Sequence, residues 1–291
     1  MTVYLNGEYL PLEEARISPM DRGFLFGDGA YEVIPVYSRR PFRLDQHLAR
    51  LGRTLEALRL ANPLTPEQWG EVVARLVETD QAHDQGVYLQ VTRGVAPVRD
   101  QAFPKPPVPP TVFAFTAPLP TPSPALLASG GAAVTVTDYR WLRCDLKTVS
   151  LVANVLLRQE SVDADCCESI LLRDGLLMEG SASNVLVVKD GVLLAPPKSH
   201  LILPGVTYDV VLELAAAHGI PTELRPVTEA ELRDADEVWI TSSTKEVLAI
   251  TRLDGQPVGH GAGAGTPGQV WQRMLALYQD FKNDVMRRAD A

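Results

Sequence analysis

The chain has 291 residues, of which 46% are hydrophobic and 22% are charged, the composition of a soluble globular protein with room for about two domains. Its net charge of −9 argues against nucleic acid as a partner, and no apolar run is long enough to predict a membrane span. The three cysteines make a poor disulfide framework, and the first residues lack the apolar core of a signal peptide, so we expect a cytoplasmic protein.

The N-terminal part predicts a small domain of strands and helices. Asn6-Gly7 is a strong signal for a two-residue hairpin turn, because both positions need a positive φ. Leucines recur at intervals of three and four over 44–61, which predicts an amphipathic helix, and Thr65-Pro66 is typical of the start of a second helix. Strands are predicted at 3–5, 9–10, 30–37, 87–92 and 111–116, with a proline-rich loop at 95–110.

A stiff linker is predicted at 118–124, where four prolines alternate with other residues. We therefore expect a smaller N-terminal domain of residues 1–117 and a larger C-terminal domain of residues 125–291. In the latter, strands are predicted at 132–137, 169–172, 176–178, 185–188, 192–195 and 237–241, and helices at 149–163, 206–218 and 268–288. Because hairpins mix with helices in both halves, we expect a mixed α+β fold rather than a regular βαβ array.

Lys147 and Glu179 are the first candidates for chemistry. Only six of the 27 basic residues are lysines, and an amine, unlike a guanidinium, can form a Schiff base. Apolar residues crowd the segment 149–157, so we expect desolvation to favour the neutral, nucleophilic amine of Lys147. A lysine and an acid suit pyridoxal phosphate (PLP), which needs an amine for its aldehyde and a carboxylate for its ring nitrogen. From spacing alone, a solvated lysine and a local salt bridge are the commoner interpretation.

A second group of residues suits an anion. Val206-Thr207 begins a predicted helix after Pro204-Gly205, where free N–H groups favour phosphate. Hydroxyl side chains and one arginine could bind the same anion. Arg50 lies just off the apolar stripe of its helix. The hydroxyl residues are Ser181, Ser183 and the run 241–244, which includes Ser242 and Ser243. Ordinary helix caps and turns are the alternative explanation. No histidine or cysteine pair has zinc-ligand spacing, so no metal site is expected.

Taken together, these segments resemble the fold-type IV PLP enzymes, the class IV aminotransferases, over nearly the whole chain. Within that family the D-amino acid enzymes are the most similar. The resemblance is carried by 21–33 (DRGFLFGDGAYEV), 47–51 (HLARL), 91–94 (VTRG), 140–147 (RWLRCDLK), 178–185 (MEGSASNV), 202–211 (ILPGVTYDVV) and 239–246 (WITSSTKE).

The resemblance implies a role for each matched residue and a two-domain fold. Lys147 would be the Schiff-base lysine and proton shuttle, and Glu179 would pair with the ring nitrogen of PLP. Tyr31 and Val33 would lie on the substrate side. The phosphate would be bound by Arg50, Val206, Thr207, Ser242 and Ser243, with Ser183 also near the cofactor. The family also implies a homodimer with the active site at the subunit interface, where the partner chain completes the substrate site.

Two departures from the family pattern concern the substrate. Arg99 matches an arginine that binds the substrate carboxylate in the D-amino acid enzymes, but Gln101 replaces a histidine and Asp100 adds a negative charge. Pro35 stands where the family often has lysine. Both changes leave the PLP chemistry intact.

We therefore predict transfer of the amino group of a D-alanine-like D-amino acid to a 2-oxo acid in a ping-pong mechanism. The alternatives of the same fold are a branched-chain L-amino acid aminotransferase, an (R)-amine transaminase and an aminodeoxychorismate lyase. A PLP-binding protein without turnover is a further alternative, favoured only by the altered 98–101 loop. A serine hydrolase is disfavoured because the chain has no G-x-S-x-G motif.

Overall fold

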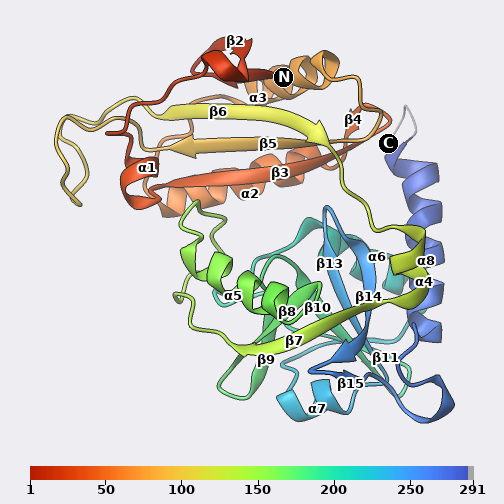
Figure 1. The fold of residues 1–291 in the computed structure, drawn as a ribbon. Coiled ribbons are helices and arrows are strands. Elements are labelled where there is room, and N and C mark those ends of the chain that lie inside the picture. The colour runs from red at the N-terminus through yellow and green to blue at the C-terminus, as the bar shows by residue number, and fades with distance from the viewer. Residues whose placement is uncertain (288–291) are drawn as a thin grey trace.

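The computed structural model describes residues 1–287 and contains two β-sheets, each formed by one half of the chain (Figure 1). The first sheet has the order β2-β1-β6-β5-β3-β4, and its neighbouring strands are antiparallel. The predicted hairpin is confirmed, because Asn6 and Gly7 turn between β1 and β2 with φ of 52° and 103°. The strands are β1 (Thr2–Leu5), β2 (Glu8–Pro11), β3 (Gly29–Tyr37), β4 (Arg40–Pro41), β5 (Gln85–Thr92) and β6 (Thr111–Pro118).

Two helices, α2 (Leu44–Ala57) and α3 (Pro66–Thr79), cover one face of this sheet (Figure 1). Their apolar stripes pack with side chains of the sheet in one buried cluster. Thr65 and Gln68 form a capping box, which confirms the predicted start of α3. The first helix ends at Ala57 and not at 61, because Arg59 has the left-handed φ of 55°. Two short helical turns are absent from the prediction, η1 (Leu12–Glu14) and α1 (Arg22–Phe26).

The second sheet has nine strands and is mixed. Its order is β12-β11-β10-β13-β14-β7-β8-β9, and β15 pairs with β14. β7 is parallel to both of its neighbours, and the predicted hairpins between β8 and β9 and between β10 and β11 are present. The strands are β7 (Gly131–Thr137), β8 (Glu168–Arg173), β9 (Leu176–Gly180), β10 (Asn184–Lys189), β11 (Val192–Ala195), β12 (Thr222–Leu224), β13 (Glu237–Ser242), β14 (Glu246–Leu253) and β15 (Gln256–Pro257).

Helices surround this second sheet. The helix predicted at 149–163 begins only at residue 152, because residues 147–149 pair with β3 instead. The terminal helix ends as an α-helix at Phe281 and continues as a π-helical turn, Lys282–Met286, while its predicted end at 288 lies outside the described residues. The helices are α4 (Pro124–Ser129), α5 (Val152–Asp163), α6 (Val206–Ala217), α7 (Glu229–Arg233) and α8 (Gln269–Phe281), with a 3₁₀ turn η2 (Gly261–Gly263).

The two halves of the chain contact each other outside the segment that connects them as well. Residues 119–123, between β6 and α4, carry no helix or strand, which is consistent with the predicted linker. α8 runs from the second sheet toward the first, and Arg287 beyond it pairs with Asp84 (Figure 1). The observed mixture of hairpins, curled sheets and covering helices confirms the α+β class. Among residues 1–287, no helix combines the length and apolarity that crossing a membrane requires.

Candidate active site

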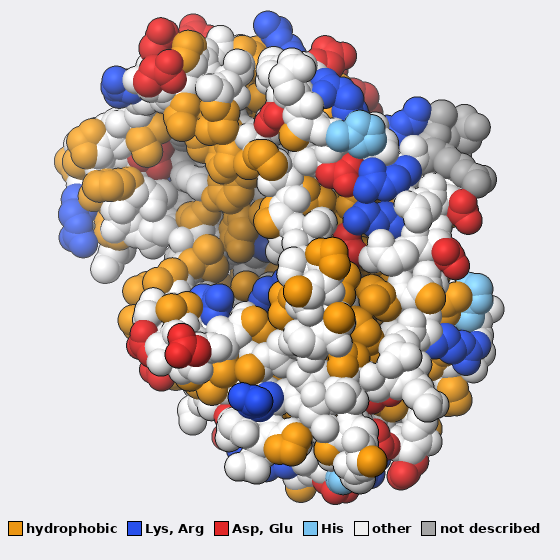
Figure 2. Space-filling model, turned by 45° about the vertical axis from the view of Figure 1, so that its right-hand side comes forward, with side chains coloured by type: hydrophobic (Ala, Val, Ile, Leu, Met, Phe, Trp, Pro, Cys, Tyr) orange, Lys and Arg blue, Asp and Glu red, His pale blue; other side chains and the backbone are white. Residues whose placement is uncertain are grey.

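A pocket of about 530 Å³ lies between the two halves of the chain and is lined by residues of both. Figure 2 shows the hollow, with hydrophobic side chains on its wall. Ten of the predicted site residues line it: Tyr31, Val33, Arg50, Lys147, Glu179, Ser183, Val206, Thr207, Ser242 and Ser243. Segments far apart in the sequence therefore meet around one cavity of the size of a cofactor site.

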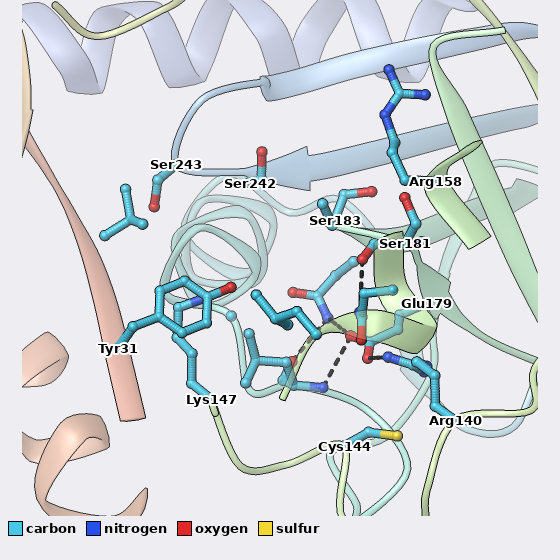
Figure 3. A pocket seen from close by; sticks show the side chains of 18 of the residues that line it. Tyr31, Arg140, Cys144, Lys147, Arg158, Glu179, Ser181, Ser183, Ser242 and Ser243 are labelled. Atoms are coloured by element: carbon cyan, nitrogen blue, oxygen red, sulfur yellow. Dashed lines mark hydrogen bonds and ion pairs between the residues drawn. The ribbon is translucent and has the colours of Figure 1, made fainter. Parts of the chain in front are cut away.

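The segment that carries Lys147 is fixed to the edge of β3. The backbone N–H of Tyr31 donates to the Lys147 carbonyl at 3.0 Å, and that of Val149 donates to the Gly29 carbonyl at 3.0 Å. Lys147 Nζ lies 4.1 Å from the centroid of the Tyr31 ring. Lys147 belongs to the C-terminal half in sequence, but its backbone is positioned by the N-terminal sheet. Figure 3 shows the lysine and the tyrosine together on one side of the pocket.

The apolar residues that follow Lys147 are not all packed around it. Val152, Val155 and Leu156 of α5 are 74%, 63% and 54% exposed, although Val155 also lines the pocket. Only Leu157 of that helix stretch is buried in the core. Lys147 itself is half-buried, and its Nζ lies beside the Tyr31 ring.

Glu179 lies at the end of β9 on the opposite side of the pocket and is buried (Figure 3). Its Oε1 accepts a hydrogen bond from Arg140 Nη1 at 2.6 Å, and its Oε2 accepts one from the Leu203 backbone N–H at 3.0 Å. Burial raises the pKa of Glu179 from 4.5 to about 7, although Arg140 acts in the opposite direction. Arg140 also forms an ion pair with Asp138 at 2.9 Å, so its positive charge is divided between two carboxylates. The carboxylate of Glu179 can therefore bind a further cationic partner.

The N-terminus of α6 forms one end of the pocket. Val206 and Thr207 are the first residues of this 12-residue helix, and Gly205 provides no side-chain cap for their N–H groups. The hydroxyl of Thr241, which also lines the pocket, is buried without a hydrogen-bond partner. Ser242 and Ser243 follow it at the tip of the β13–β14 hairpin. Unpaired donors at a helix N-terminus fit the phosphate group of PLP.

Arg50 faces this end of the pocket from α2. Its Nε and Nη2 donate to the two carboxylate oxygens of Glu32 at 2.7 and 2.8 Å, and its Nη1 donates to the Pro204 carbonyl at 2.8 Å. A guanidinium has five N–H groups, so donors remain for an anion. Glu32 also contacts His47 Nδ1 at 2.9 Å, which fixes the carboxylate behind Arg50.

Ser183 has a different role in the structure from the one expected. It lines the pocket, but its hydroxyl donates to Glu168 Oε2 at 2.6 Å, and the hydroxyl of Ser181 donates to Oε1 of the same carboxylate. A hydroxyl has one hydrogen, so neither serine retains a donor for a phosphate oxygen. This arrangement argues against Ser183 as a phosphate ligand.

The structure does not bring Arg99 and Gln101 into this pocket. Arg99 is exposed and lies over the ring of Phe26, at 5.0 Å from its centroid. The backbone next to it is held by Arg22, whose Nη2 donates to the Gln101 carbonyl at 3.0 Å. Gln101 borders a separate depression, lined also by Arg93. Neither residue lines the pocket that holds Lys147.

Several residues of the site lack a predicted role. Arg140 lies in the segment 140–147 that carries the resemblance, but nothing in its spacing points to Glu179, 39 residues away. Asn184, whose side chain contacts Glu179 Oε2 at 3.3 Å, lies in another such segment. Glu168 and Lys245 form an ion pair between distant segments; Lys245 lies in the segment 239–246 that carries the resemblance, but nothing in the sequence pairs it with Glu168.

Comparison with known proteins agrees with this geometry. Residues 29–253 match the family Amino-transferase class IV. The chain is 41% identical over 280 residues to the D-alanine aminotransferase of Bacillus licheniformis, covering 96% of each chain. It is 40% identical over 283 residues to the D-alanine aminotransferase of Staphylococcus epidermidis, covering 97% of each.

Solved structures give the same family. The branched-chain amino acid aminotransferase of T.th. with pyridoxamine 5'-phosphate is 26% identical and superposes with a TM-score of 0.88 over 99% of this chain and 95% of that chain. The same enzyme complexed with N-(5'-phosphopyridoxyl)-L-glutamate has 26% identity and a TM-score of 0.87 over the same shares. The chain belongs to the class IV aminotransferases and is a PLP-dependent enzyme of that family.

Proposed function

We propose that this chain is a D-amino acid aminotransferase, which moves the amino group of a D-alanine-like substrate to a 2-oxo acid. The observation that carries the proposal is one pocket with an amine, Lys147, facing a buried carboxylate, Glu179, beside a helix N-terminus with free donors. Relatives about 40% identical over nearly the whole chain are D-alanine aminotransferases, which supports this donor class.

The residues of the pocket fit PLP from end to end. Val206, Thr207, Ser242 and Ser243 would bind its phosphate together with Arg50, and Glu179 would accept the hydrogen of the ring nitrogen. PLP, once bound, supplies an electron sink for the bonds at the α-carbon of the substrate. Burial of Glu179 excludes water from this contact, so a cationic ring nitrogen would have no competing solvent.

Lys147 would hold the cofactor covalently in the resting enzyme and then serve as the base. Its Nζ would take a proton from the α-carbon of the amino donor and hold it for return, and the reverse transfer would serve the 2-oxo acid. The Tyr31 ring beside Nζ limits the directions that the lysine side chain adopts. A lysine fixed on one face of the pocket delivers the proton to one face of the substrate, which gives one enantiomer.

A homodimer would complete the substrate site. Large apolar side chains are exposed beside the pocket, on α5 and on the loop before Lys147, where Tyr139, Trp141 and Leu142 are 55%, 49% and 63% exposed. α1 and the loop with Arg99 lie on the same side of the molecule as α5 (Figure 1). A contiguous exposed apolar surface of this kind marks an interface. The partner's copy of this loop would then supply an arginine and a glutamine to the substrate carboxylate.

The experiment that tests the proposal is a half-reaction with single amines. Purified enzyme with PLP is mixed with D-alanine or with L-leucine, and the absorbance of the cofactor is followed. We expect conversion with D-alanine and little with L-leucine. Conversion with L-leucine alone would instead establish the branched-chain activity, and a yellow protein that no amine converts would indicate a binding protein without turnover.

The branched-chain alternative has its own support. The branched-chain enzyme of T.th. superposes with a TM-score of 0.88, and Gln101 departs from the pattern of the D-amino acid enzymes. The donor screen should therefore also include an (R)-amine and aminodeoxychorismate.

Cys144, Cys166 and Cys167 are free, which supports a reducing compartment and hence the cytoplasm.

A further inference from the structure

Glu168 is a buried carboxylate that contacts the wall of the pocket from behind. It begins β8, is fully buried, and does not line the cavity. Its Oε1 accepts hydrogen bonds from the backbone N–H groups of Ser169 at 3.0 Å and Ser181 at 3.1 Å, and from the Ser181 hydroxyl. Its Oε2 accepts from the Ser183 hydroxyl at 2.6 Å. One carboxylate therefore fixes the turn that follows Glu179.

Lys245 supplies the positive charge for this carboxylate. Its Nζ lies 2.8 Å from Glu168 Oε2 and also donates to the Cys167 carbonyl at 3.3 Å. The Lys245 side chain is only 23% exposed, so the pair is shielded from solvent on both sides. Burial by itself raises the pKa of Glu168, but Lys245 and the hydrogen bonds outweigh it and lower the pKa below its usual value, which keeps the group ionised.

The backbone of Lys245 belongs to another part of the pocket wall, the turn between β13 and β14. Its N–H donates to Ser242 Oγ at 3.1 Å and closes the turn between β13 and β14. Ser242, Ser243 and Thr244 in this turn line the pocket, and Figure 3 shows Ser242 and Ser243 on a different strand connection from Ser181 and Ser183. The ion pair thus joins the turn after Glu179 to the hydroxyl turn at 242–244.

Gly180 shows how tightly these parts approach one another. A Cβ at this position would clash with Ser183 Oγ and would lie 3.0 Å from Glu168 Cδ. Small displacements of the Glu168 carboxylate are therefore transmitted to the backbone next to Glu179.

We propose that Lys245 and Glu168 are a positioning pair that sets the spacing between the ring-nitrogen end and the phosphate end of the cofactor site. The inference rests on the proposed assignment of 206–207 and 242–243 to the phosphate. Lys245 acts through the hydroxyl turn and touches no substrate, so its loss weakens binding of the phosphate before it changes the chemistry at Lys147.

The test compares PLP with pyridoxal, which lacks the phosphate. The apoprotein is titrated with each, and the dissociation constants are measured for wild type and for Lys245→Met, which keeps the length of the side chain and removes its charge. We expect the Kd for PLP to rise about tenfold, the lower end of the effect of groups that support a binding site from behind. The Kd for pyridoxal should change less than about twofold, because it has no phosphate to misplace.

Rescue and coupling distinguish positioning from a general loss of structure. Lys245→Arg retains a cation that can reach Glu168, so it should restore the PLP affinity to within about threefold of wild type. The double variant Glu168→Gln/Lys245→Met should bind PLP no more weakly than the weaker-binding of the two single variants, because the two residues act through one contact.

Glu237→Gln is the matched control. Glu237 is also a buried carboxylate, at the far end of β13, where it accepts hydrogen bonds from the backbone N–H groups of Val270 and Trp271 at 2.9 and 2.8 Å. This variant should lower the melting temperature and leave the PLP affinity of the folded protein unchanged. Equal losses for PLP and pyridoxal in Lys245→Met, or an unchanged Kd for PLP, would overturn the proposal. The readout is cofactor affinity, so a preference for another amine in the turnover test has no bearing on it.

Discussion

Lys147 and Glu179 come to the same pocket from different sheets, and each is fixed by backbone contacts that other residues make. Lys147 is held by pairing with β3, and Glu179 by Arg140 and the backbone of Leu203. Lys147 is half-buried, so removal of its side chain should change chemistry more than folding, whereas Glu179 is buried and its ionisation also bears on stability.

Lys147→Ala should abolish the covalent link to PLP while the protein folds. Only one half-buried side chain is removed, and the backbone bonds to β3 remain. Activity should fall by at least about a thousandfold, within the range for loss of a proton-transferring group. Borohydride reduction followed by peptide mapping measures the link, and Lys189→Ala is the control because Lys189 pairs with Asp234 at the surface. A label on any other lysine would disprove the role of Lys147.

Glu179→Gln should reveal a pH-dependent cost of the buried carboxylate in the apoprotein. Burial raises the pKa of Glu179 from 4.5 to about 7, so the folded state binds a proton that the unfolded state releases. Its contribution to stability is complete below about pH 4.5 and is lost as the pH rises through about 7. Relative to Glu179→Gln, the wild-type apoprotein should lose about 3 kcal/mol of unfolding free energy over this interval.

Urea unfolding at a series of pH values measures this difference. The same comparison with PLP bound should show a much smaller pH dependence, because a cationic ring nitrogen would keep the carboxylate ionised. If the wild type and the variant have parallel pH profiles as apoproteins, Glu179 is already ionised throughout, and the argument from its burial fails.

Single residues differ in how well the sequence alone identifies them. Lys147 and Glu179 stand out because their residue types are needed for PLP chemistry. Glu168 does not, since its partner Lys245 is 77 residues away and only the pairing of strands brings them together. The apolar run after Lys147 is also misleading, because three of its side chains are exposed in the structure.

At the scale of elements, the N-terminus of α6 is placed by an unusually close approach. Gly205 precedes the helix, and a Cβ there would clash with Asn184 Oδ1, whose side-chain amide contacts Glu179 and the Leu203 carbonyl. The φ of Gly205 is −74°, which any residue adopts, so the glycine is needed for space rather than for conformation. The position of the helix N-terminus and the orientation of Asn184 are therefore coupled.

Gly205→Ala should weaken PLP binding by about tenfold, or 1.4 kcal/mol, because the helix N-terminus must move away from the phosphate. A titration of the apoprotein with PLP measures the change. Gly70→Ala, in the middle of α3 with open space around it, is the control. It should stabilise the protein by about 0.5–1 kcal/mol without altering the affinity. An unchanged Kd in Gly205→Ala would show that the Asn184 side chain moves aside without displacing the N-terminus of α6.

Elements with local signals are the ones that the sequence predicts well. The capping residue Thr65, the Asn6-Gly7 turn and the amphipathic stripe of α2 each act within a few residues, and all are confirmed. β14 (Glu246–Leu253) is missed because it is buried on both faces and lacks alternation. Residues 149–151 are assigned wrongly to a helix, because the segment before α5 pairs with β3, which is more than 100 residues away.

At the scale of the whole molecule, the proposed dimer predicts that two inactive variant chains regain activity when they are combined. Lys147 lines the pocket, whereas Arg99 lies outside it. If the partner supplies Arg99, Lys147→Ala and Arg99→Ala chains are each inactive alone but together form hybrids with one intact site. After unfolding and refolding as an equal mixture, about a quarter of the wild-type activity should return, since half of the dimers are hybrids with one working site.

Size-exclusion chromatography of the mixture and of each parent provides the check on assembly. A mixture that stays inactive while forming dimers would mean that both residues act within the same chain, which contradicts the proposed origin of the substrate site. The overall fold and family follow from sequence resemblance over nearly the whole chain, but the subunit that supplies Arg99 does not, because a sequence carries no record of which copy completes a contact.

The pairing of residues 147–149 with β3 has a consequence for how the molecule stays together. It places the amine end of the cofactor site on the N-terminal sheet, while Glu179 and α6 belong to the C-terminal sheet. A ligand bound at both ends spans the boundary between the two halves and links them. The vitamin B6 cofactor would then stabilise the contact between the two halves as well as supply the chemistry, in addition to the contacts that Arg287 and residues 147–149 already make.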